Sequence, residues 1–423
     1  MSMKLLVFDD RDFVHLPDQA PDWGPVADTR AVFSVRTGAL TTLERLQREW
    51  PHGLAGLWVP NHLIARTRQA CTVPVNEAPE PGQTLLCING RWVFPGSQFE
   101  IGPGQALVEQ STGAVVAACL ESEQAGFFLE DGALPADVEQ IGYAGRLLAR
   151  RPWELLGLLS QTMATDLPAM IEQSRSGEDA CDGSIPDTVP GITALEPDNV
   201  WVHPSARIYP SVVLDAEGGP IYIDDRAIIR PGSILCGPAY IGPGSTVLDR
   251  SLIKANTSIG PVCKVTGEVG STIFQGYANK AHDGHLGDSY IGAWANLGAG
   301  TTNSNLLNTY GEIMARLRPQ AHRERTGMMY LGSIIGDHVK TAINTRLMTG
   351  TVIGTGSMIA STAAPPTSIG AFSWITDVGI HPYRFEKFID VARVVLRRRN
   401  LDLTEADVEL LRILHQRETA ASS

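Results

Sequence analysis

The densest group of residues that could do chemistry lies between positions 279 and 305. Within it, His282 could act as a general base toward an amine or a hydroxyl, because the pKa of histidine lies near working pH. Asparagine amides can orient sugar hydroxyls without adding charge. Backbone N–H groups near 298–300 could face a developing oxyanion. The chemistry this favours is acyl transfer onto a small polar acceptor.

Two lysines upstream could supply positive charge for a phosphate, which lysine binds as a point charge. Lys264 lies 18 residues before His282, and Lys254 lies ten residues further back. The alternative is that the histidines only cap turns. The spacing of His282, Asp283 and His285 is compatible with a metal. No additional ligand from a distant part of the chain is evident, so no metal is expected.

These residues sit within a six-residue repeat. A strict period of six fits neither a helix nor a single amphipathic strand, and it is typical of a hexapeptide β-helix. Three short strands then close one coil of about 18 residues, with the repeated apolar residue pointing inward. The unbroken run is Ile223, Ile229, Leu235, Ile241, Val247, Ile253, Ile259 and Val265.

The repeat extends in both directions, with interruptions. It begins near Val202 and is broken at 215–220; after Val265 it resumes at Ile291 and continues as far as Ile359. The longer interruption, 306–331, carries several arginines and is predicted to leave the coil. Such an excursion can border a binding site, or it can be a solvated basic loop.

The sequence predicts three parts in addition to the β-helix. Residues 1–140 indicate a mixed α/β domain, 141–197 a helical segment and a linker, 198–378 the β-helix, and 379–423 terminal helices. The arginine run 397–399 is interpreted as a solvated match to a helix dipole. Expected elements are strands at Lys4–Phe8, Leu54–Val59 and Thr84–Ile88, a helix at Leu40–Trp50, and a second tail helix capped by Thr404.

The composition excludes some classes of protein. The chain has 423 residues, and 34 Lys and Arg against 46 Asp and Glu give a net charge of −12, which argues against a nucleic-acid partner. No stretch approaches 18 apolar residues and no signal peptide is evident. Six cysteines without C-x-x-C spacing favour a reduced, cytoplasmic location.

The block from Phe274 to Gly311, FQGYANKAHDGHLGDSYIGAWANLGAGTTNSNLLNTYG, carries a family resemblance. It resembles the acetyltransferase half of the bifunctional N-acetylglucosamine-1-phosphate uridylyltransferase / glucosamine-1-phosphate N-acetyltransferase family. It is most similar to a divergent branch described as sugar nucleotidyltransferases of the Bacteroidetes type. LLVFDD, LLCINGR, RPWELL and GDHVKTAINT extend the resemblance over the chain. It implies a left-handed β-helix, a homotrimer with sites between subunits, acetyl-CoA as donor and glucosamine-1-phosphate as acceptor.

The resemblance also implies roles for individual residues. His282 matches the catalytic base, and His285 stands where the family has a tyrosine that contacts the sugar. Ile343 replaces a serine used near the donor. The implied acceptor contacts are Lys254, Lys264, Lys280, His285, Asn296 and Asn305, and the implied donor contacts are Ala299 and Gly300.

The N-terminal half departs from the family pattern. The expected glycine-rich phosphate loop is replaced by Asp9-Asp10-Arg11, and the metal-binding aspartate by Asn89-Gly90-Arg91. The candidate nucleotide contacts are therefore Asp9, Asp10, Arg30 and Asn89, with Mg²⁺ expected only if this half is active. We expect a domain that has lost or rebuilt its nucleotidyl-transfer site.

The sequence thus predicts an enzyme that N-acetylates an amino-sugar phosphate for UDP-N-acetylglucosamine synthesis. Two alternatives stay open. One is a sugar-1-phosphate nucleotidyltransferase that uses UTP or dTTP, and the other is a non-catalytic trimeric scaffold that binds sugar nucleotides.

Overall fold

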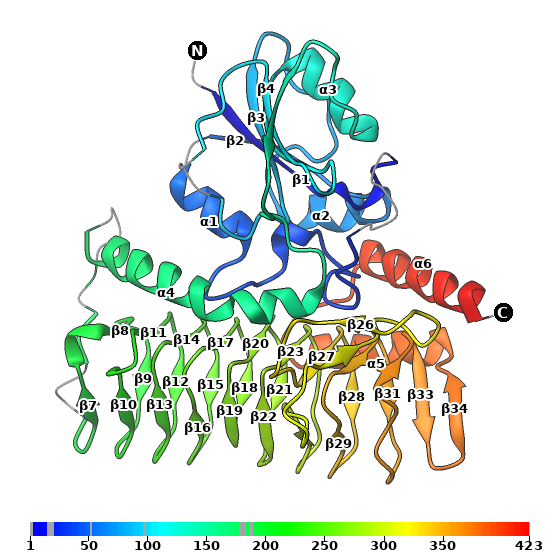
Figure 1. Cartoon of the computed structure of the whole chain (residues 1–423). Helices are drawn as coiled ribbons and strands as arrows, with labels where there is room; N and C mark the ends of the chain where they lie inside the picture. Colours follow the sequence, from blue (N-terminus) through cyan, green and yellow to red (C-terminus); the bar gives the residue numbers. More distant parts are fainter. Residues whose placement is uncertain are drawn as a thin grey trace.

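The chain folds into an α/β domain seated on a long β-solenoid (Figure 1). The computed structural model describes residues 3–14, 21–50, 53–95, 99–176, 181, 183–185 and 189–422. None of the helices in these ranges is long and apolar enough to cross a membrane.

The N-terminal domain is built on a six-stranded sheet of order β2-β1-β3-β5-β4-β6. Its first three strands in this order are parallel, and β5 runs antiparallel to β3 and β4. The elements are β1 (Lys4–Phe8), α1 (Thr42–Glu49), β2 (Leu54–Trp58), α2 (Ile64–Ala70), β3 (Thr84–Asn89), β4 (Gln105–Glu109), β5 (Val115–Glu121), α3 (Ser122–Asp131) and β6 (Glu139–Tyr143). The strands and the helix expected up to position 89 are confirmed to within two residues.

The hexapeptide prediction is confirmed by a solenoid of short parallel strands. All eight residues of the unbroken run are fully buried in one continuous core. The nine-stranded β8–β32 sheet contains β8 (Val200–Val202), β11 (Ile221–Ile223), β14 (Ala239–Ile241), β17 (Thr257–Ile259), β20 (Ile273–Phe274), β23 (Tyr290–Ile291), β27 (Ser333–Ile335), β30 (Thr351–Ile353) and β32 (Ser368–Ile369).

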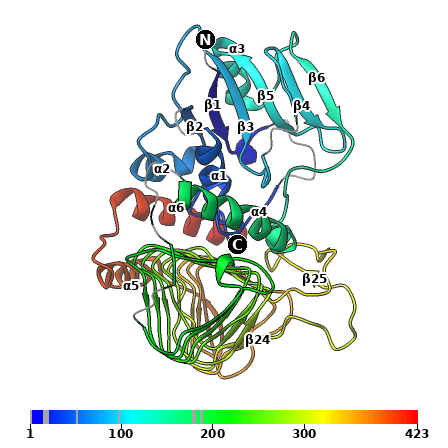
Figure 2. The same ribbon diagram turned by 90° about the vertical axis from the view of Figure 1, so that its left-hand side faces the viewer.

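Two more walls complete the prism, whose open end Figure 2 shows. The β7–β22 sheet contains β7 (Thr193–Leu195), β10 (Val213–Asp215), β13 (Ile234–Cys236), β16 (Leu252–Ile253), β19 (Glu268–Gly270) and β22 (His285–Gly287). The β9–β21 sheet contains β9 (Arg207–Ile208), β12 (Ile228–Ile229), β15 (Thr246–Val247), β18 (Lys264–Val265) and β21 (Asn279–Lys280). Single bridges through Asn296 join β21 to the later strands β28 (Lys340–Thr341), β31 (Met358–Ile359), β33 (Ser373–Thr376) and β34 (Gly379–Pro382).

The coil length is not constant. Lys264 pairs with Asn279, only 15 residues later, whereas earlier partners such as Ile221 and Ala239 are 18 apart. The interpretation that Lys264 lies one coil away from His282 was therefore wrong, because it assumed a constant coil. The shortened coil also places Lys280 beside Val265, at an inward-pointing position.

The 306–331 stretch leaves the coil as predicted. It forms a small antiparallel hairpin of β25 (Met314–Ala315) and β26 (Glu324–Arg325). The solenoid continues across it, since β23 pairs directly with β27. Near the base of the excursion, β24 (Thr302–Asn303) pairs with β29 (Arg346–Leu347).

Helices fasten the two parts together. The long helix α4 (Pro152–Ser176) lies along the β8–β32 sheet, where Trp153 and Leu159 share one core with Trp201 and Tyr222 of the solenoid (Figure 1). The C-terminal helix α5 (Phe385–Arg397) lies beside the solenoid, and α6 (Glu405–Ser422) returns beneath the N-terminal domain (Figure 2). Thr404 caps α6 as predicted, since its hydroxyl accepts from Asp407 N at 3.1 Å.

Candidate functional site

The corner between β21 and β22 carries His282, whose side chain is exposed. The corner is held from inside by Lys280, which is 1% exposed. Its ammonium donates to the carbonyl oxygens of His282 at 2.8 Å and Asp283 at 3.0 Å. Burial lowers the pKa of Lys280 to about 8. Lys280 therefore braces the corner from the core and is not placed to hold a substrate phosphate, which corrects the sequence-based expectation.

A first polar group lies on the β7–β22 sheet next to this corner. Glu268 Oε1 is 3.3 Å from Lys254 Nζ and 3.5 Å from His285 Nδ1. Beside it, Asn305 donates to Asp288 Oδ2 at 2.6 Å, and burial raises the pKa of Asp288. The structure thus brings together Lys254, His285 and Asn305, three of the expected acceptor contacts, around two carboxylates that the sequence did not single out.

A second group lies around the next edge of the prism. Lys264 and Asn296 line a pocket of about 400 Å³ between the β9–β21 sheet and α5. We call it the cationic pocket, because Lys340, Arg398 and Arg399 also line it, and no carboxylate is found among its described lining residues. Ala281, the neighbour of His282, forms part of its wall.

The arginines of this pocket correct the interpretation of the 397–399 run. Arg399 is not simply solvated, since its Nη2 donates to Asn279 Oδ1 at 2.9 Å across the gap between α5 and the solenoid. Lys340 was missed because the excursion separates it from Asn296 by 44 residues, although the two are bridge partners. Burial lowers the pKa of Lys340 to about 8.

The expected donor contacts lie at the following corner of the same wall. Ala299 O accepts from Asn344 N at 2.7 Å, and Gly300 has φ +71°, where a Cβ would meet Asn344 Oδ1 at 2.2 Å. Glycine is required there by both conformation and space. The N–H of Gly298 is already donated to Thr341 Oγ1 at 3.0 Å. Among the expected oxyanion donors, Gly298 is therefore committed elsewhere.

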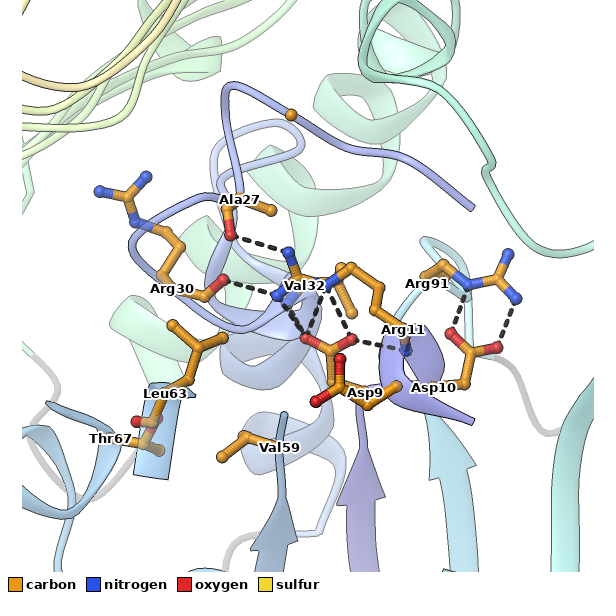
Figure 3. A network of polar contacts seen from close by, with 12 residues as sticks. Asp9, Asp10, Arg11, Ala27, Arg30, Val32, Val59, Leu63, Thr67 and Arg91 are labelled. Carbon is orange, nitrogen blue, oxygen red and sulfur yellow. Dashed lines mark hydrogen bonds and ion pairs between the residues drawn. The ribbon is translucent and has the colours of Figure 1, made fainter. Parts of the chain in front are cut away.

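In the N-terminal domain, the two adjacent carboxylates after β1 face different arginines (Figure 3). Asp9 binds Arg11 at 2.7 Å and also accepts from Val32 N at 3.0 Å. Asp10 binds Arg91 through two bonds, of 2.7 Å and 2.5 Å. Both aspartates are at most 2% exposed, so they form a buried salt-bridge network.

The other two candidate nucleotide contacts are also engaged. Asn89, fully buried, donates to Asp10 Oδ2 at 2.8 Å and to Val115 O at 3.0 Å. Arg30 reaches across to the solenoid and binds Asp337 at 2.5 Å. The structure therefore brings Asp9, Asp10 and Asn89 close together but directs the Arg30 side chain away from them (Figure 3).

The fit of a metal can be judged from these contacts. Mg²⁺ takes oxygen ligands, and both Asp10 oxygens already accept from the Arg91 guanidinium. Across the part of the chain that the structure describes, no group of three His, Cys, Asp or Glu side chains could hold a metal ion. The residues present do not fit a Mg²⁺ site at this sheet edge.

The chain is similar to known proteins over part of its length. Residues 5–175 match the sugar nucleotidyl transferase family. The bifunctional protein GlmU of Cyanothece sp. is 28% identical over 192 residues, which cover 40% of this chain and 38% of that protein. A bifunctional sugar-1-phosphate nucleotidylyltransferase/acetyltransferase of Sulfurisphaera tokodaii is 30% identical over 158 residues, covering 36% and 38%.

Among solved structures, a hexapeptide transferase family protein from Anaplasma phagocytophilum is 14% identical, with a TM-score of 0.19 over 55% of this chain and 90% of that chain. The alignments to the curated relatives span well under half of those proteins' own length. The chain is therefore similar over residues 5–175 to the sugar nucleotidyl transferase family, and over about two fifths of its length to bifunctional GlmU proteins.

Proposed function

We propose that this protein transfers an acetyl group from acetyl-CoA to the amine of an amino-sugar phosphate, with glucosamine-1-phosphate as the first candidate acceptor. The observation that carries the proposal is the cationic pocket beside the His282 corner. Lys264, Lys340, Arg398 and Arg399 converge there without a carboxylate among the described lining residues. Such a site favours a phosphate-bearing ligand.

In this mechanism His282 acts as the general base. The amine nitrogen attacks the thioester carbonyl carbon, while the His282 imidazole takes the proton that the nitrogen loses. The C–N bond forms and the C–S bond breaks, and the thiolate leaves with a proton as free thiol. Lys280 positions the base by holding the His282 and Asp283 carbonyl oxygens from the core.

The two polar groups suggest how the acceptor is shared between subunits. Lys254, His285 and Asn305 lie on one wall of the prism, and Lys264 and Asn296 lie on another. We propose a homotrimer in which the first wall of one protomer faces the second wall of the next. Ile343, 69% exposed, stands on this part of the surface and would be covered there.

A second candidate function is nucleotidyl transfer from UTP or dTTP to a sugar-1-phosphate, which the family match over residues 5–175 favours. The arginine partners of Asp9 and Asp10 weigh against it, because they occupy the two carboxylates after β1 that could replace the missing metal-binding aspartate. We therefore propose that the N-terminal domain of this chain serves structure or binding, and that the solenoid carries the chemistry.

Steady-state release of free thiol from acetyl-CoA, with glucosamine-1-phosphate as acceptor, tests the proposal. We expect His282→Ala to lower kcat by about 10²–10⁴-fold, as for loss of a general base. His203→Gln is the matched control, because His203 is a partly exposed solenoid histidine just after β8, near the other end of the same prism. Full activity of His282→Ala would show that the base is assigned wrongly.

A further inference from the structure

An aromatic ladder climbs one corner of the solenoid. Tyr277, Trp294 and His338 occupy successive coils, with ring centroids 4.5 Å apart for the first pair and 6.3 Å for the second. All three have positive φ, of +56°, +64° and +59°. Asn and Gly adopt this backbone conformation far more readily than aromatic residues. Other corners of the solenoid hold Val262 at φ +57° and Phe372 at φ +49°, so the left-handed backbone belongs to the turn, and the three adjacent rings are what distinguish this corner.

The ladder separates two pockets and belongs to both. One is the cationic pocket. The other, of about 610 Å³, lies between the N-terminal domain, the solenoid and α6, and we call it the interdomain pocket. Tyr277 and Trp294 line both pockets. The two hollows therefore meet at the ladder and can hold two parts of one ligand.

The two pockets differ sharply in charge. In the interdomain pocket the arginines are already paired: Arg30 with Asp337 at 2.5 Å, Arg66 with Asp407 at 2.6 Å, and Arg36 with Glu44 at 3.5 Å. An uncharged polar group fits such a wall. In the cationic pocket, Lys340 Nζ donates two long hydrogen bonds, to Trp294 O at 3.4 Å and His338 O at 3.3 Å, which are weaker than those of Lys280, and no carboxylate is among the described lining residues. Burial lowers the pKa of Lys340 to about 8, and a bound anion would relieve that cost.

Two buried polar atoms of the interdomain pocket have no partner within the described part of the chain. They are Arg36 Nε and His338 Nδ1. The two residues are 6% and 8% exposed, respectively. Leaving such an atom unsatisfied in a buried position destabilises the folded protein. Both residues line the interdomain pocket. Both atoms lie beneath the pocket surface, so a ligand with hydrogen-bonding edges would meet them after a turn of the Arg36 or His338 side chain.

We propose that the two pockets form one channel that binds a nucleoside diphosphate group, with the nucleoside against the aromatic ladder in the interdomain pocket and the diphosphate among the four cations. A flat heterocycle supplies both ring contact and hydrogen-bonding edges, and the diphosphate supplies the charge. This group occurs both in a nucleotide-linked sugar and in coenzyme A. The diphosphate would occupy the same four cations that the proposed function gives to the acceptor phosphate, so the two ligands would compete there. Binding to the channel can be measured without acyl transfer; only its catalytic meaning rests on the proposed function.

Isothermal titration calorimetry on the full chain tests the proposal with UDP, ADP, coenzyme A and inorganic pyrophosphate as probes. We expect at least one nucleotide probe to bind more tightly than pyrophosphate. Trp294→Asn removes a ring while suiting the left-handed corner, and Arg399→Gln removes a cation. Each is expected to weaken that nucleotide at least tenfold, whereas pyrophosphate should respond to Arg399→Gln and not to Trp294→Asn.

Arg397→Gln is the matched control, because Arg397 lies at the same helix end but is 71% exposed and outside the pocket lining. Lys264→Gln is a second test should Arg399→Gln fold poorly. If UDP binds and UDP-N-acetylglucosamine competes with it, the nucleoside diphosphate site belongs to a sugar nucleotide. If coenzyme A is the only nucleotide probe that binds, the site belongs to the acetyl donor. Absence of binding, or binding unchanged in both channel variants, overturns the proposal. His282→Ala should leave binding of the nucleotide probe unchanged. Failure of the acyl-transfer proposal can therefore be told apart from failure of the channel proposal.

Discussion

Arg30 of the N-terminal domain and Asp337 of the solenoid form a buried ion pair, with Nη2 and Oδ2 2.5 Å apart. Asp337 also accepts from the hydroxyl of Thr29 and from Ala293 N, the latter at 2.7 Å. One carboxylate thus ties a loop of the first domain to two coils of the solenoid. Because the pair lines the interdomain pocket, the same contact that joins the domains also shapes the candidate ligand channel.

Breaking this pair should be costly. Arg30→Met leaves the buried Asp337 charge without its cation, and loss of one partner of a buried pair typically costs about 3–5 kcal/mol. Arg318→Met is the matched control, since Arg318 also joins the solenoid excursion to the N-terminal domain, through Asp22, but its side chain is 52% exposed. That surface pair is expected to contribute below about 1 kcal/mol. Equal losses in urea unfolding would contradict the role given to Asp337.

The stability of the protein should fall with acid partly through His338. Burial, and then the charge of Lys340, lower the pKa of His338 from its ordinary value of 6.5 to about 3. The folded state holds the ring neutral, whereas the unfolded chain protonates it as the pH falls below 6.5. Stability from this group is therefore complete above pH 6.5 and is lost as the pH falls toward 3.

His338→Phe isolates this contribution, because Phe372 occupies a positive-φ position in the same chain and shows that the ring is tolerated. Between pH 7.5 and pH 5, urea unfolding of the variant should lose about 2 kcal/mol less than the natural protein. His62, whose pKa burial lowers to about 4, titrates in both proteins and cancels in the comparison. Identical pH dependence would show that His338 is not held neutral.

The repeat made much of the fold predictable. A period of six identifies every inward residue from Ile223 to Val265, because each coil must bury the same position against the next. The excursion and the tail helices also follow from local pattern. The candidate site was harder to predict, since it depends on where the coil length changes. In the coil of 15 residues, Lys264 pairs with Asn279 and Lys280 takes the inward position beside Val265. The spacing of the residues in the sequence does not reveal this pairing.

The partners of the charged residues were the second feature that the sequence could not predict. From sequence, Asp9, Asp10 and Arg30 are chemically able to bind a nucleotide, and nothing local shows which partners they will meet. Arg91 and Asp337, the partners of Asp10 and Arg30, lie 81 and 307 residues away in the chain. Arg399 likewise reaches Asn279 across 120 residues. Long-range pairing decides whether a charge is free to bind ligand, and it is set by the tertiary fold.

Lys280 and Lys264 should give opposite kinetic signatures. Lys280→Met removes the internal brace of the His282 corner, so we expect kcat to fall about tenfold or more, with the acceptor KM changed less than about threefold. Lys264→Met removes an exposed cation of the cationic pocket, so we expect the KM to rise about tenfold with kcat retained. Thermal melting checks that each variant is folded. A raised KM for Lys280→Met with unchanged kcat would restore Lys280 as a phosphate contact.

Mg²⁺ should have little influence on this protein. Both oxygens of Asp10 are held by Arg91, so no free carboxylate edge is offered to the ion at the end of β1. We expect millimolar Mg²⁺, added to protein that already contains UTP, to cause no further shift in the melting temperature of the natural protein or of Asp10→Asn. EDTA should leave acyl transfer unchanged, and no pyrophosphate should be released from UTP and a sugar-1-phosphate. A Mg²⁺-dependent rise in melting temperature that Asp10→Asn abolishes would mean that Arg91 yields its place to the metal, and nucleotidyl transfer would become the better assignment for this domain.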